Sequence, residues 1–134
     1  MKNNGGITLI EVLVAMAIVF IVFLGMSSAG LVVLDQNIRN SQRDEAVSVA
    51  EMEMQQVRNT PFNVLTLAAD NVSVSIDNVS RQIRGLTVNF GVWRTVTQLN
   101  VNNLQVTIRV TWNRIENSLT RSYNHTVITI VRST

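Results

Sequence analysis

The stretch GGITLIEVLVAMAIVFIVFLGMSSAGLVVL, from Gly5 to Leu34, decides how the rest of the chain can fold. From Val12 to Leu34 every position is apolar except two glycines and two serines. As a helix this run of about 23 residues would be roughly 35 Å long, and a bilayer core is about 30 Å thick. A soluble core helix rarely needs an apolar surface of that length on every side. The sequence therefore predicts a helix that spans a membrane.

The run carries one carboxylate, Glu11, close to its start. Ionisable groups inside a membrane are costly, by about 2.5–3.5 kcal/mol at mid-depth, and they are usually paired. No Lys, Arg or His follows Glu11 within the span. If the chain were cut after Gly6, the new α-amine of Ile7 would lie one helical turn away, at i,i+4 spacing. The same amine on a neighbouring copy could pair with Glu11 equally well.

These residues resemble the N-terminal signal of type IV prepilins. That signal is a short basic leader ending in Gly, followed by an apolar residue, Thr, Leu, another apolar residue, Glu and an unbroken apolar helix. The matching residues here are Lys2, Gly6, Ile7, Thr8 and Glu11, with Ile7 where Phe is commonest. The resemblance implies that prepilin peptidase, a membrane aspartyl protease, cleaves after Gly6 and methylates the amine of Ile7. It also implies that Glu11 and Thr8 serve in assembly.

Two other interpretations of this stretch stay open. It could be an ordinary secretory signal, cleaved near Ala29 and followed by a secreted β-domain, or it could be a plain uncleaved anchor. The apolar run is longer than the about 7–15 residues typical of a secretory signal. Neither alternative gives Glu11 a role, so the sequence favours the prepilin interpretation.

Beyond Leu34 the helix is expected to continue. Residues 35–58 contain no Pro or Gly, and apolar residues recur there at roughly helical spacing, which predicts an amphipathic helix. Asn59-Thr60-Pro61 should end it, because the residue before a proline is pushed out of the α region. The expected apolar stripe is Leu34, Ile38, Ala46, Val49 and Val57. The expected organisation is a leader at 1–6, a transmembrane and filament-core helix at 7–34, an amphipathic continuation at 35–60, and a variable connection with an antiparallel sheet at 61–134.

The last part of the chain alternates apolar and polar residues, which is typical of half-buried strands. The predicted fold class is therefore α+β, a long N-terminal helix packed on a C-terminal antiparallel β-meander. The family resemblance implies the ladle shape of pilins. The expected segments are a connection with a weak strand signal at 62–80, strands at 86–90 and 92–99 separated by Gly91, a strand at 104–112, a turn at 113–118 and a last strand at 119–132.

Residues 104–133 are similar to the end of PilV-like minor pilins. Those proteins have an alternating Val/Thr strand that closes on a Trp, here Trp112, then a polar turn and a Thr-rich strand. The resemblance implies a structural minor subunit of a type IV pilus, or a minor pseudopilin of a type II secretion system. The implied partners are other pilins, prepilin peptidase, the inner-membrane assembly platform and membrane lipid. The implied location is the bacterial inner membrane, with a cytoplasmic N-terminus and a periplasmic or extracellular head, and then the filament.

Nothing in the sequence indicates an enzyme, a metal or a cofactor. There is no Cys, and the single histidine, His125, is expected on a strand surface. No metal-ligand spacing or phosphate-binding Gly-rich loop is found. From Asn59 onward seven arginines outnumber three acidic residues, so a DNA-binding face is one hypothesis. The favoured alternative is that these arginines lie on solvent faces of strands and keep the sheet soluble. The candidates are Arg81, Arg84, Arg94, Arg109, Arg114 and Arg121.

Overall fold

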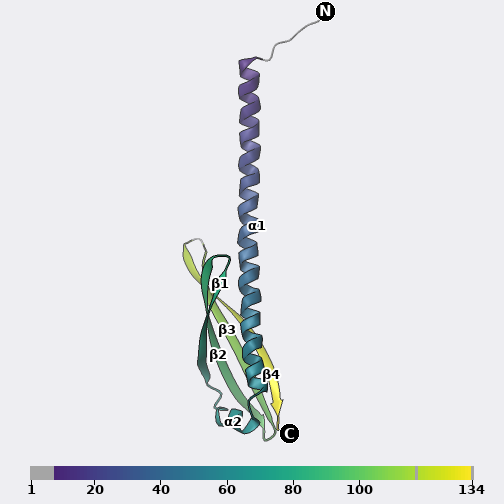
Figure 1. The fold of residues 1–134 in the computed structure, drawn as a ribbon, viewed down its shortest axis with the longest axis vertical. Coiled ribbons are helices and arrows are strands. Elements are labelled where there is room, and N and C mark those ends of the chain that lie inside the picture. Colours follow the sequence, from purple (N-terminus) through teal and green to yellow (C-terminus); the bar gives the residue numbers. More distant parts are fainter. Residues whose placement is uncertain (1–7, 117, 134) are drawn as a thin grey trace, which may run out of the picture. The chain divides into compact units, whose positions relative to one another are not determined.

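The computed structural model of the protein describes residues 8–116 and 118–133. The chain forms two compact units, the first ending at Asn37 and the second beginning at Ile38. A long N-terminal helix is followed by a short helix and a four-stranded antiparallel sheet, which confirms the predicted α+β class. In chain order the elements are α1 (Leu9–Arg58), α2 (Phe62–Leu67), β1 (Ser73–Ile83), β2 (Leu86–Asn100), β3 (Asn103–Glu116) and β4 (Leu119–Arg132) (Figure 1).

The first part of α1 has the surface of a membrane helix. Of the described helices, α1 alone is long and apolar enough to cross a membrane, with a mean hydropathy of 2.8 over its most apolar segment. Its large apolar side chains up to Leu34 are exposed. Ser27 and Ser28 donate their hydroxyls to the carbonyls of Phe23 and Leu24, at 3.0 and 3.1 Å. Both hydroxyls are thus satisfied inside the helix, which suits a lipid environment.

The end of α1 agrees with the prediction from Pro61. The helix runs to Arg58, and the amide of Asn59 still donates to the carbonyls of Gln55 and Gln56, both at 3.1 Å. The hydroxyl of Thr60 donates to the carbonyl of Gln56 at 2.8 Å. Pro61 has no amide hydrogen with which to continue the ladder.

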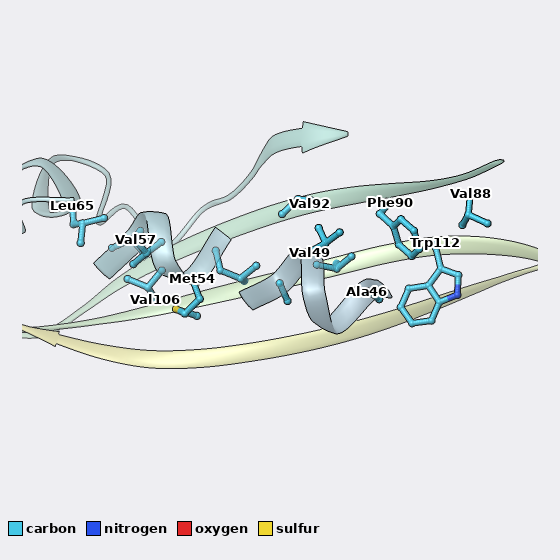
Figure 2. Packing of buried hydrophobic residues seen from close by; sticks show 14 of the residues in the cluster. Ala46, Val49, Met54, Val57, Leu65, Val88, Phe90, Val92, Val106 and Trp112 are labelled. Carbon is cyan, nitrogen blue, oxygen red and sulfur yellow. The ribbon is translucent and has the colours of Figure 1, made fainter. Parts of the chain in front are cut away.

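The second unit is built around a meander in the order β1-β2-β3-β4, with each strand antiparallel to the next. Successive residues of a strand face opposite sides of the sheet, and the register brings Phe90 opposite Trp112 and Val92 opposite Val110. These four side chains are buried with the second part of α1, so one face of the sheet forms the core (Figure 2). The core residues from α1 are Ala46, Val49, Ala50, Met54 and Val57.

The predicted break between two strands at Gly91 is wrong, because β2 is continuous from Leu86 to Asn100. Gly91 pairs with Asn78 on β1 and with Thr111 on β3. The hydroxyl of Thr111 donates to the carbonyl of Gly91 at 3.3 Å. A Cβ added at Gly91 would lie 3.1 Å from the hydroxyl oxygen of Thr111. The glycine therefore makes room for a neighbouring side chain and does not end the strand.

Two other boundaries also differ from the prediction. Strand β3 continues to Glu116, four residues past Trp112, so the expected turn over 113–118 is much shorter. The expected connection over 62–80 contains the helix α2 and most of β1. Leu65 of α2 is buried in the core, whereas a six-residue helix is too short for its apolar spacing to be recognised in the sequence.

The buried stripe of α1 matches the prediction in part. Three of the expected residues, Ala46, Val49 and Val57, are buried, Ile38 is half-buried and Leu34 is exposed. Two polar residues that the sequence did not single out, Gln42 and Glu53, are also buried, each 5% exposed. The sheet therefore covers one face of α1 from Gln42 onward, and the covered side chains include polar as well as apolar ones.

Candidate assembly site and charged sites

The predicted assembly residues Thr8 and Glu11 form the start of α1. The carbonyl of Thr8 accepts from the amides of Glu11 and Val12, at 3.0 and 3.2 Å. The Thr8 hydroxyl also accepts from the Glu11 amide, at 3.4 Å. Thr8 therefore occupies the position of a helix N-cap, and it satisfies amides that the first turn leaves without intrahelical partners. The two predicted processing residues, Gly6 and Ile7, lie outside the described residues.

Glu11 is exposed and lies in the first turn of α1. A carboxylate there interacts favourably with the amide end of the helix dipole. Together with Glu11, apolar side chains one and two turns further on, among them Ala15, Val19 and Phe20, line a shallow apolar groove on the helix surface. The small side chain of Ala15 helps to form this groove. The carboxylate thus lies at one end of a surface on which another apolar helix could pack.

The candidate arginines for DNA binding do not share one face of the sheet. Arg109 is exposed on the outer face, with its guanidinium carbon 5.9 Å from the ring centroid of Trp93. Arg81 and Arg94 pair in register with the buried residues Val88 and Ile108, so they are on the helix-covered face. Only Arg109 clearly matches the expected solvent-face position. A single arginine face for DNA is therefore not formed.

Glu116 is the centre of a charged cluster that the sequence analysis missed. Its carboxylate lies 3.4 Å from the guanidinium of Arg39, 3.7 Å from that of Arg114 and 3.6 Å from that of Arg121. The hydroxyl of Tyr123 donates to the same carboxylate at 2.7 Å. This hydrogen bond, with smaller effects of burial and of the negative charge, raises the pKa of Tyr123 above its ordinary value. The cluster ties the second unit's first helical turns to the β3–β4 hairpin.

Beside this cluster, α1, β3 and β4 enclose a pocket of about 380 Å³. Its lining includes three arginines and the histidine His125, and it includes no carboxylate. The aromatic rings of Trp112 and Tyr123 form part of its wall, with their centroids 5.9 Å apart in a stacked arrangement. The arginines are Arg39, Arg43 and Arg114. His125, which the sequence predicts on a strand surface, is half-buried and lines this cationic pocket.

Glu53 is a second charged residue that the sequence did not single out. It lies on the buried face of α1 and is almost fully buried. Burial raises the pKa of Glu53, the nearby carboxylate of Asp77 raises it further, and Arg94 acts in the opposite direction. No group of three or more His, Asp or Glu side chains that could hold a metal ion is found in the described part of the chain.

Comparison with known proteins bears on the N-terminal residues. Residues 1–27 match the family model described as the prokaryotic N-terminal methylation motif. The chain carries a type IV prepilin-like N-terminus. This motif implies processing by prepilin peptidase and assembly with other pilins, and with the apolar part of α1 it supports anchoring in the inner membrane. Searches of curated proteins and of solved structures found no match.

Proposed function

We propose that this protein is a minor pilin, a structural subunit that is anchored in the inner membrane and then drawn into a type IV pilus. The observation that carries the proposal is the methylation motif over residues 1–27, whose residues from Leu9 onward lie in a long, exposed apolar helix. Cleavage after Gly6 would leave Ile7 as the first residue, with its methylated amine one turn from Glu11. The subunit then acts by packing into a filament and has no catalytic role.

Glu11 is the residue to which we assign the recognition step. In the filament its carboxylate neutralises the amine of Ile7, its own or that of a neighbouring subunit, and so sets the register of the subunits. The apolar groove that runs from Glu11 past Ala15 supports this, because a neighbouring helix packed there would bring its N-terminus close to the carboxylate. Thr8 contributes by capping the helix, which fixes the direction of the first turn.

Two observations support assignment to the minor-pilin branch. The β3–β4 hairpin carries the sequence similar to the end of PilV-like proteins, and its Trp112 is buried between Phe90 and Tyr123, with both pairs of ring centroids 5.9 Å apart. A minor pseudopilin of a type II secretion system is the second candidate, because it would share the same processing motif. An ordinary secretory signal is disfavoured, since α1 runs without interruption through Ala29.

A filament-incorporation experiment tests the proposal. Glu11→Ala and Glu11→Gln should reduce incorporation of the subunit about 100-fold, because an uncompensated amine within the apolar filament core costs about 2.5–3.5 kcal/mol. Glu51→Gln, at an exposed position of the same helix, is the matched control and should assemble normally. Normal incorporation of Glu11→Ala would refute the pairing mechanism.

Processing is tested separately. Gly6→Leu should leave the precursor uncut, as judged by its mobility and intact mass, whereas Gly5→Leu should still be cleaved. Unimpaired cleavage of Gly6→Leu would count against the peptidase assignment.

A further inference from the structure

The cationic pocket lies at one end of the second unit. Its helical wall is the first turn and a half of α1 after Ile38, and its strand wall is the part of β3 and β4 next to their turn. The meander places the β1–β2 turn at this same end and the β2–β3 turn at the opposite end. The pocket is therefore at the end of the sheet where the chain enters from the apolar segment.

Chain length limits the distance between this pocket and the apolar run. Arg39 follows Leu34, the last residue of the apolar run, by only five residues. Even a fully extended chain of five residues spans no more than about 17 Å, and a helical one about 7.5 Å. The headgroup layer on each side of a bilayer is roughly 5–8 Å deep. Arg39, the first arginine of the pocket, therefore lies within about 17 Å of the end of the apolar run.

The charge of the pocket fits an anion. Three guanidinium groups and an imidazole line it with no carboxylate among the lining residues. Glu116 approaches Arg39 and Arg114 from outside the lining and balances part of their charge. No ion pair of Arg43 is found within the described residues. The buried amide of Gln42 and the exposed amides of Asn40 and Asn124 add hydrogen-bond donors. Guanidinium forks and amides together are suited to phosphate oxygens.

The hairpin turns beside the pocket carry exposed aliphatic residues next to arginines. Ile115 and Leu119 are 74% and 63% exposed at the β3–β4 turn, and Leu86 is 52% exposed at the β1–β2 turn. Aliphatic side chains flanked by Arg are typical of surfaces that enter the headgroup layer. Leu67 and Val101 are also exposed, at the far end of the sheet, so exposed aliphatic side chains alone do not identify the end that faces lipid. Only the end with the β3–β4 turn combines exposed aliphatic side chains with the cationic pocket.

We propose that this pocket binds the phosphate of an anionic lipid headgroup while the subunit is in the membrane. Arg39 and Arg43 reach the phosphate from α1, and Arg114 and His125 reach it from the sheet. DNA would offer the same phosphate chemistry, but the short distance in sequence to the span and the aliphatic turns favour lipid. The site would hold the second unit against the membrane surface before assembly.

The test uses the full mature chain in a neutral detergent, with lipid binding followed by native mass spectrometry. Phosphatidylglycerol should be retained at least tenfold more strongly than phosphatidylcholine with the same acyl chains. Arg43→Gln should weaken phosphatidylglycerol binding about fivefold, the effect expected of one arginine near an anionic surface. Arg58→Gln, at the other end of the same helix, is the matched control and should have no effect. Both arginines are exposed, so neither change is expected to prevent folding.

Three results would overturn the proposal. The first is equal retention of the two lipids, and the second is an equal loss of binding in Arg43→Gln and Arg58→Gln. The third is displacement of phosphatidylglycerol by inorganic phosphate or by a short DNA duplex at lower concentrations than the lipid itself. The inference rests on the membrane anchoring that the proposed function also requires. A chain that lacks lipid preference and still has a methylated Ile7 would refute the lipid site alone.

Discussion

Replacing Glu116 with glutamine should disconnect the β3–β4 hairpin from the helix electrostatically while preserving the shape of the side chain. Two of the three ion pairs contribute little, because the Arg39 and Arg121 side chains are 51% and 63% exposed, and such pairs are worth about 0–1 kcal/mol each. The third is different, since the Arg114 and Glu116 side chains are only 11% and 13% exposed. Removing one partner of a buried pair costs about 3–5 kcal/mol, but the 3.7 Å separation is long and glutamine keeps an acceptor oxygen.

We therefore expect Glu116→Gln to destabilise the second unit by about 2–3 kcal/mol. For a unit of this size, each kcal/mol shifts the melting temperature by about 4–8 °C, so the shift should be about 10–20 °C. Near-UV circular dichroism of the full chain in detergent would measure it. Glu45→Gln is the matched control, because its ion pair with Arg81 at 2.8 Å joins side chains that are about one-third exposed or more. That change should cost less than about 1 kcal/mol.

The same variant has a second readout, because Tyr123 is the only tyrosine in the chain. Its hydrogen bond to Glu116 raises the pKa of Tyr123, so Glu116→Gln should lower that pKa towards the ordinary value of 10.0. A raised pKa stabilises the fold below pH 10, and this contribution is lost as the pH rises through the raised value. Ultraviolet titration of tyrosinate would detect the change. Equal melting temperatures for Glu116→Gln and Glu45→Gln, together with an unchanged pKa of Tyr123, would show that Glu116 does not connect the hairpin to the helix.

Three further changes test other parts of the second unit. Burial, and to a smaller extent the carboxylate of Asp77, raises the pKa of Glu53, so its contribution to stability is present below pH 4.5 and is lost as the pH rises through the raised pKa. Glu53→Gln should therefore stabilise the protein at pH 7 and make its stability less dependent on pH. Melting temperatures measured over a range of pH would detect both effects. Phe90→Ala should cost about 3–5 kcal/mol in denaturant unfolding, because Phe90 is fully buried. Arg84 has a φ of 50° before Gly85 in the β1–β2 turn, a conformation that Asn adopts more readily than Arg. Arg84→Asn should therefore raise the unfolding free energy by up to about 1 kcal/mol. An equal or lower unfolding free energy would contradict the turn geometry.

The parts of the fold that the sequence predicts well are those with a long, regular pattern. The apolar run to Leu34 and the end of the helix before Pro61 depend on local properties, and the structure agrees with both. The last strand, over 119–132, also has its predicted bounds. Glycine weakens strands, so the sequence predicts a break at Gly91, whereas the cross-strand contact with Thr111 explains why a glycine stands there.

The link between the helix and the charged cluster could not be predicted, because Arg39 is distant in sequence from Glu116. The sequence predicts a turn at Glu116, and nothing local indicates that Arg39, 77 residues earlier, reaches it. The positive charge of the second half suggested an arginine face, but the alternation of strands distributes those residues over both faces. The cationic pocket depends on the same tertiary arrangement, so only the excess of arginine was visible in the sequence.

We propose that the chain is a prepilin-like precursor whose mature form begins at Ile7. Mass spectrometry of the mature protein, isolated from cells that make filaments, would identify its first residue. We expect a chain that begins at Ile7 and carries one methyl group on its α-amine. A chain that begins near Gly30 or Leu31, or one that still begins at Met1, would contradict it.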